Sequence, residues 1–164
     1  AEQIESLRVL DAVVAESLRL LPTGLWGQRD ATEDTHIGPC AVKRGTRVIY
    51  STLVTQRLPE IYPEPYRFRP ERWFDDAPPP YAYLAFGAGP RLCIGRALAL
   101  VETKLVLAVL LQRYRLSFRA GTHIDRYSFS AAAGSPLPMV VHGQDGEFGR
   151  EWIQGNIHYL VDLG

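Results

Sequence analysis

The chain has 164 residues, 46% of them hydrophobic and 22% charged, which is the balance of an ordinary globular protein with one core. Its 18 basic and 18 acidic side chains cancel, so bulk charge indicates neither a nucleic-acid partner nor a membrane surface. Two cysteines, no visible signal peptide and no apolar run of membrane-spanning length predict a reducing, cytoplasmic location. The four histidines lack ligand spacing, which argues against a histidine-based metal site.

The first predicted element is a helix over residues 4–21. Apolar residues recur every three or four positions and form one stripe: Leu7, Leu10, Val14, Leu18 and Leu21. Residues 12–21 hold only three polar side chains, so we expect this half to be buried nearly all round. Two of the three, Glu16 and Arg19, lie three residues apart and share a face. Taken alone, an exposed ion pair of little energetic weight is the better interpretation.

Pro22 ends this helix, and residues 23–27 form a short uncharged segment. Strands are predicted over 36–42 and 47–50, joined by a turn in which Gly45 suits a positive φ. Residues 51–57 fit a short helix. The proline-rich stretch 59–80 carries several aromatic residues and is therefore expected to be packed, irregular coil.

Residues 86–95, the cysteine loop, read Phe-Gly-Ala-Gly-Pro-Arg-Leu-Cys-Ile-Gly and lead into an apolar run, 94–111, that is predicted to be a central helix. Cys93 at the start of a helix faces N–H groups and the positive end of the dipole, which favours the metal-binding thiolate. The glycines let backbone pass close to the sulfur and to a flat ligand beside it. Arg91 offers a fixed charge for a carboxylate. For a lone cysteine, a buried structural role is the stronger interpretation.

The remaining elements complete a fold that is mainly α with small β-sheets (α+β). Glu102, inside the apolar helix, is expected to need a buried partner. Residues 114–118 alternate like a strand, and 128–141 predict strand, turn and strand, with Gly134 and Pro136 at the tip. Residues 144–164 carry no readable motif. The glycines of the cysteine loop lack the third glycine of a dinucleotide-binding fingerprint.

The cysteine loop resembles the haem-binding signature of the cytochrome P-450 family of haem-thiolate monooxygenases, Phe-x-x-Gly-x-Arg-x-Cys-x-Gly. Every fixed position of that signature is filled here: Phe86, Gly89, Arg91, Cys93 and Gly95. The resemblance implies haem b as cofactor, with the Cys93 thiolate as the proximal iron ligand. It also implies that Arg91 pairs with a haem propionate and that Phe86 packs beside the sulfur.

The resemblance implies further haem contacts. The fixed Gly95, and outside the fixed positions Gly87 and Ala99, match positions beside the ring. Arg29 is a candidate for the second propionate, and a surface arginine is a nearly equal interpretation of it.

Two other stretches are similar to the same family. Glu16-x-x-Arg19 is similar to its Glu-x-x-Arg helix, and residues 70–73, Pro-Glu-Arg-Trp, resemble a later element that usually reads Pro-Glu-Arg-Phe. The resemblance implies that Arg72 joins the Glu16–Arg19 pair in a structural role. Gln56 begins Gln-Arg-Leu-Pro where the family commonly has His-Arg-Asp-Pro, and we assign it no haem contact.

These matches cover residues 4–141 and belong to the C-terminal part of the family's domain. We therefore expect residues 1–164 to be an incomplete domain without the N-terminal part and the long distal helix that carries the acid and alcohol beside the oxygen. No catalytic residue is assigned in this chain. Without cover, apolar patches would face water and promote association, which predicts a complementing chain or poor solubility.

The resemblance implies a monooxygenase that inserts one atom of O₂ into a small organic substrate. Electrons would come from a reductase or ferredoxin docked on the proximal face near Cys93. The strand after the first helix would line the substrate pocket, with Leu25 and Trp26 as candidates and packing residues as an equal interpretation; residues 132–135 are further candidates. The alternatives are a non-catalytic haem-binding or docking half-domain that needs a complementing chain, and a degenerate remnant, against which the intact signature argues.

Overall fold

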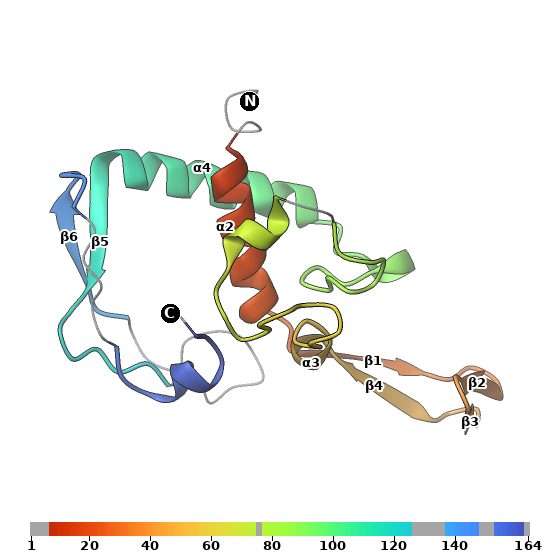
Figure 1. The fold of residues 1–164 in the computed structure, drawn as a ribbon. Helices are drawn as coiled ribbons and strands as arrows, with labels where there is room; N and C mark the ends of the chain where they lie inside the picture. Colours follow the sequence, from red (N-terminus) through yellow and green to blue (C-terminus); the bar gives the residue numbers. More distant parts are fainter. Residues whose placement is uncertain (1–6, 75–76, 126–136, 148–152, 163–164) are drawn as a thin grey trace.

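The computed structural model describes residues 7–74, 77–125, 137–147 and 153–162. Within them, two long helices, α2 (Arg8–Leu20) and α4 (Arg96–Arg113), cross one another, and short antiparallel strand pairs lie at the periphery (Figure 1). Long irregular segments connect these elements. The predicted class, mainly α with small β-sheets, is confirmed.

Helix α2 buries a face that differs from the predicted apolar stripe. Its buried residues are Ala12, Val14, Glu16, Arg19 and Leu20. Of the predicted stripe, only Val14 is among them. The Glu16–Arg19 pair decides the orientation, because its partners lie in residues 56–73 and draw this face inward. The expected burial nearly all round residues 12–21 is confirmed, since only Ser17 is exposed there.

After α2 the chain forms a long hairpin with a second hairpin at its tip (Figure 1). The strands are β1 (Trp26–Asp30), β2 (Thr35–Ile37), β3 (Cys40–Val42) and β4 (Arg47–Ser51); β1 pairs with β4, and β2 pairs with β3. The single strand predicted over 36–42 is wrong, because Gly38 turns the chain with a φ of 56° and Pro39 has no N–H to continue a ladder. The turn over 43–46 therefore leads into β4 without pairing the two predicted strands.

The short helix α3 (Thr52–Thr55) follows β4 directly. The Ser51 hydroxyl accepts a hydrogen bond from the Val54 N–H (3.2 Å) and caps the start of the helix. The coil that follows is packed, as predicted, since Tyr62 is almost completely buried within it. Its one described helical turn is the 3₁₀ element η1 (Pro70–Trp73), which lies against α2.

Strand β5 (Tyr114–Phe118) pairs with β6 (Met139–Gly143), so the strand predicted over 114–118 is confirmed. Most of the hairpin predicted over 128–141 lies outside the described residues, as do its tip residues and the substrate candidates 132–135.

The C-terminal stretch, which carries no sequence motif, supplies three of the five residues of the hydrophobic core cluster. The core cluster consists of Leu20, Ile124, Ile153, Ile157 and Val161. The 3₁₀ element η3 (Asn156–Tyr159) follows Gly155, whose φ of 107° favours glycine. The end of α2 is thereby anchored against residues more than 100 positions away in the sequence.

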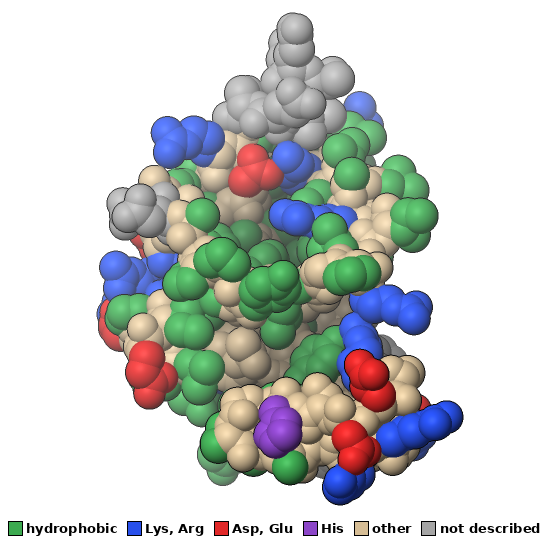
Figure 2. Space-filling view, turned by 90° about the vertical axis from the view of Figure 1, so that its right-hand side faces the viewer, with side chains coloured by type: hydrophobic (Ala, Val, Ile, Leu, Met, Phe, Trp, Pro, Cys, Tyr) green, Lys and Arg blue, Asp and Glu red, His purple; other side chains and the backbone are tan. Residues whose placement is uncertain are grey.

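Helix α4 is predicted to be central, yet its apolar side chains are exposed in the structure. Among them are Leu98, Val101, Leu105, Val106 and Val109, which we call the apolar face of α4. The expected burial of Glu102 is wrong, because Glu102 is exposed. The buried charge is Lys104, whose Nζ lies 2.8 Å from Asp11 Oδ1 on α2. Figure 2, which views the molecule from the right-hand side of Figure 1, shows hydrophobic side chains gathered above the charged tip of the hairpins.

Candidate functional site

The cysteine loop is held by main-chain hydrogen bonds. The Gly87 N–H donates to Leu84 O (2.9 Å), and the Cys93 N–H donates to Phe86 O (2.8 Å). Between them lies the 3₁₀ turn η2 (Gly89–Arg91). Gly87 and Gly89 have φ values of 73° and 63°, in the left-handed region that other residues adopt at a cost. Glycine at these two positions therefore shapes the loop.

Cys93 presents a free thiol on the outside of this loop. Helix α4 begins at Arg96, two residues later than predicted, and the Arg96 N–H donates to Cys93 O (3.2 Å). A side chain on Gly95 would lie 3.8 Å from the Cys93 sulfur, so the glycine leaves that side open. The neighbouring Ile94 and Leu98 are exposed. An accessible thiol beside open apolar surface fits a flat apolar macrocycle whose iron takes a thiolate ligand.

The other predicted haem contacts in this region are placed as follows. Phe86 lines a cavity between α2 and α4 together with Trp73 and Tyr83, while Cys93 is exposed, and the packing of Phe86 beside the sulfur stays a prediction. Ala99 is half-buried in the first turn of α4 and donates its N–H to Gly95 O (2.9 Å). Arg91 is exposed at the end of η2.

The candidates on β1 make local contacts. The Arg29 guanidinium donates to Gln28 O (2.6 Å) and lies over the Tyr50 ring, 5.6 Å from its centre. Both contacts are within the β1–β4 hairpin, and the structure does not join Arg29 to the cysteine loop through any described contact. Trp26 begins β1 and is 45% exposed. Leu25 is half-buried, and its carbonyl accepts the Leu53 N–H (3.2 Å).

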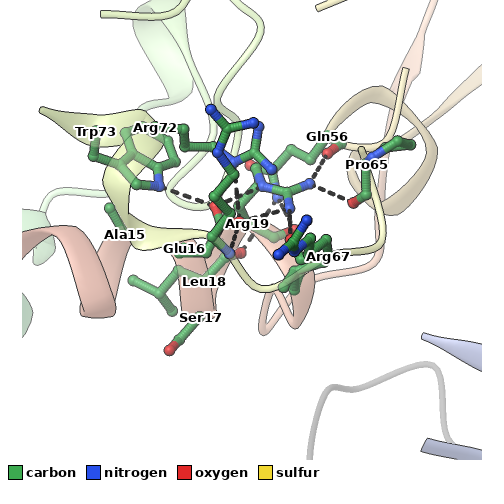
Figure 3. Close-up of polar contacts among 12 residues, drawn as sticks. Ala15, Glu16, Ser17, Leu18, Arg19, Gln56, Pro65, Arg67, Arg72 and Trp73 are labelled. Carbon is green, nitrogen blue, oxygen red and sulfur yellow. Dashed lines mark hydrogen bonds and ion pairs between the residues drawn. The ribbon is translucent and has the colours of Figure 1, made fainter. Parts of the chain in front are cut away.

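The structure brings Glu16, Arg19 and Arg72 together in an ion network (Figure 3). The completely buried Glu16 carboxylate accepts five hydrogen bonds. Two come from Arg19 (2.8 Å each) and one from Arg72 Nε (3.0 Å). The others come from the Arg69 main-chain N–H (2.9 Å) and the Trp73 indole N–H (2.9 Å). Because the buried carboxylate is fully paired, its hydrogen bonds and neighbouring charges offset the desolvation cost that an isolated charge would carry.

Arg19 uses all of its N–H groups in this network. Besides its two bonds to Glu16, it donates to the carbonyls of Gln56 (2.8 Å), Pro65 (2.8 Å) and Arg67 (3.3 Å). Arg72 likewise donates to two main-chain carbonyls of the coil, those of residues 63 and 64. The two arginines thus fasten the irregular coil to α2, which is the work expected of a structural set.

Burial and pairing act in opposite directions on the network's acid. Burial raises the pKa of the Glu16 carboxyl, but hydrogen bonds from Arg19, the Arg69 N–H and Trp73 outweigh it, so the pKa lies below its ordinary value. Tyr62 stacks beneath the Arg19 guanidinium at 5.1 Å, and burial raises its pKa to about 12. The network is therefore ionic at neutral pH.

Sequence reasoning missed three contributors to this region. The Trp73 indole supplies a donor that the phenylalanine usual at this position lacks, and this difference was visible in the sequence. The Arg69 N–H had no sequence signal, since main-chain donors carry none. Gln56, buried between α2 and the coil, was signalled only as a departure from the family pattern.

Comparisons with known proteins show the family of this chain. The sequence profile of the family Cytochrome P450 matches residues 1–139. A cyclooctat-9-en-7-ol 5-monooxygenase of Streptomyces melanosporofaciens is 39% identical over 142 residues, which are 85% of this chain and 31% of that protein. Cytochrome P450 4c21 of Blattella germanica is 40% identical over 115 residues, 68% of this chain and 23% of that protein.

A solved structure, retinoic acid-bound cyanobacterial CYP120A1, superimposes with a TM-score of 0.79 at 30% identity, covering 87% of this chain and 34% of that one. The chain belongs to the cytochrome P450 family. It spans about a third or less of the length of these relatives. None of the helices in the described part of the chain is long and apolar enough to cross a membrane.

Proposed function

We propose that this chain is the proximal, haem-binding part of a cytochrome P450 monooxygenase. The observation that carries the proposal is the accessible Cys93 thiol in a loop shaped by two left-handed glycines and closed by the Cys93–Phe86 hydrogen bond. Haem bound there would supply the oxygen-activating chemistry of a parent enzyme that inserts one atom of O₂ into an organic substrate.

Each candidate residue of the haem site would have its own part in this function. Cys93 would hold the iron as thiolate, and Arg91, exposed two residues away, would pair with a propionate. Gly95 and Ala99 would leave room beside the ring. Arg29, which lies over the Tyr50 ring within the β1–β4 hairpin, is the weaker candidate for pairing with a propionate, and we rank it below Arg91.

The ion network would act at a distance from the haem. Glu16, Arg19 and Arg72 tie the coil behind the cysteine loop to α2, and none of the three needs to touch substrate or cofactor for this role. A reductase or ferredoxin would deliver electrons on the face that carries Cys93. A small organic substrate would lie on the other side of the haem, towards Leu25 and Trp26. The cytoplasmic location stays a prediction from composition.

A second candidate function is a haem-binding or docking half-domain without activity of its own. The observation that favours it is the exposed apolar face of α4, whose five side chains are each 44–70% exposed, since contiguous exposed apolar surface often marks an interaction site. A complementing chain, or the remainder of the same protein, would cover this face. Substrate turnover by residues 1–164 with an added reductase would exclude this candidate.

The test is the absorption spectrum of the reduced, carbon monoxide-bound protein after loading with haem. We expect a Soret band diagnostic of thiolate ligation, and its loss in Cys93→Ala. Cys40→Ala is the matched control, because Cys40 is also an exposed free thiol but lies on β3. A thiolate band that survives in Cys93→Ala, or that disappears in Cys40→Ala, contradicts the assignment of Cys93.

A further inference from the structure

The C-terminal end of α2 leaves main-chain carbonyls without helical partners. The Leu18 carbonyl would normally accept from the N–H four residues on, but that residue is Pro22, which has none. For Arg19 and Leu20, the corresponding donors lie beyond the end of the helix. Three buried or half-buried carbonyls therefore need donors from another part of the chain.

Gln56 and Arg57, just after α3, supply these donors. The Gln56 side-chain amide donates to the carbonyls of Arg19 (2.9 Å) and Leu18 (3.3 Å), and the Arg57 guanidinium donates to that of Leu20. Gln56 is completely buried, so water cannot replace it there. Its own carbonyl accepts from Arg19, which Figure 3 shows beside it.

The other end of the Gln56 side chain reaches towards the cysteine loop. Its Oε1 accepts the Leu84 N–H at 2.7 Å. Leu84 lies two residues before the loop and accepts the Gly87 N–H, while within the loop Phe86 O accepts the Cys93 N–H. Hydrogen bonds thus connect the end of α2, through one buried side chain, to the turn that holds the Cys93 main chain.

We propose that Gln56 is a positioning residue for Cys93, which fixes the cysteine loop relative to α2 and so sets the direction of the sulfur towards the haem. This inference rests on the proposed function of the chain. An amide suits the place because it donates at one end and accepts at the other. Histidine can donate from one ring nitrogen and accept at the other, whereas methionine offers no donor.

The experiment uses the haem-loaded protein and three variants at this position. Gln56→Met keeps the shape but removes both functions. Gln56→Asn keeps the amide but is too short to join Leu84 to α2. Gln56→His retains one donor and one acceptor. Gln154→Leu, at an exposed glutamine far along the chain, is the matched control.

The readout is the rate at which the reduced, carbon monoxide-bound form loses its thiolate Soret band, measured well below each variant's melting temperature. Loss of a buried hydrogen bond should accelerate this conversion about tenfold in Gln56→Met and Gln56→Asn. Gln56→His and Gln154→Leu should convert at close to the wild-type rate. This difference is independent of turnover.

Two results overturn the inference. The first is a wild-type conversion rate in both Gln56→Met and Gln56→Asn. The second is a lower melting temperature with an unchanged rate below it, which would make Gln56 a stabilising residue only. If Gln56→Met does not fold, Gln56→Asn decides. Failure of the wild-type protein to show the thiolate band would instead overturn the proposed function, so the two failures are distinguishable.

Discussion

The substitution Trp73→Phe tests the energetic weight of the ion network. Phenylalanine keeps an aromatic ring against Tyr83, whose centre lies 5.0 Å from that of Trp73, but removes the indole N–H that donates to Glu16 at 2.9 Å. A hydrogen bond to a charged group contributes about 1.5–3 kcal/mol net. Four donors remain on the carboxylate, so the buried charge stays paired and the larger cost of an unpaired ion does not arise. We therefore expect Trp73→Phe to lower the free energy of unfolding by about 2 kcal/mol.

The assay is urea denaturation of the protein that carries this chain, with Trp26→Phe as the matched control. A lower midpoint at unchanged slope for Trp73→Phe indicates loss of native-state stability. Trp26, 45% exposed, should change the free energy of unfolding by less than about 0.5 kcal/mol. In a Glu16→Gln background the Trp73 effect should shrink towards that of a neutral hydrogen bond, about 1 kcal/mol. A Trp73→Phe value equal to the control, or an effect unchanged by Glu16→Gln, would refute the reasoning.

Three further predictions concern charges and backbone. Because the pKa of Glu16 in the folded state lies below its ordinary value of 4.5, its contribution to stability is present above that pH and is lost as the pH falls through the folded pKa. Glu16→Gln should therefore flatten the fall in urea midpoint between neutral and acidic pH. Asp11→Ala leaves the Lys104 ammonium buried without its partner and should lower the free energy of unfolding by about 1–3 kcal/mol. Adding Lys104→Met should restore much of this loss. An unchanged urea midpoint in Asp11→Ala would show that the pair contributes nothing. Gly155→Ala should cost more than about 2 kcal/mol, since φ is 107° and the new Cβ would lie 2.3 Å from a main-chain oxygen, whereas Gly24→Ala, with open space around it, should cost under about 1 kcal/mol in the same denaturation assay.

Helices α2 and α4 show where the apolar pattern of the sequence and the structure disagree. The apolar periodicity predicted both helices, and both are present with their ends shifted by a few residues. Periodicity failed to predict which face is buried. In α2 the charged pair faces inward because the coil supplies hydrogen-bond partners for Glu16 and Arg19. In α4 the apolar face is open because no described segment covers it.

In the hairpin region, the predicted strand was wrong for a local reason. The single strand predicted over 36–42 does not form, because Gly38 and Pro39 interrupt any ladder there. The pairing of β1 with β4 joins residues about 20 positions apart, and no nearest-neighbour pattern contains that register.

The sequence by itself determined the candidate site. Through its resemblance to the family's motifs, the sequence singled out Cys93 with its glycines, and Glu16, Arg19 and Arg72, as candidate residues. Their residue types suit these places, because a left-handed turn favours glycine and a buried carboxylate needs cations. Only the tertiary structure decided that Arg69 N–H and Trp73 complete the carboxylate's shell and that Gln56 bridges α2 and the cysteine loop. These contacts depend on backbone groups and on segments distant in sequence, which meet only when the coil packs against α2.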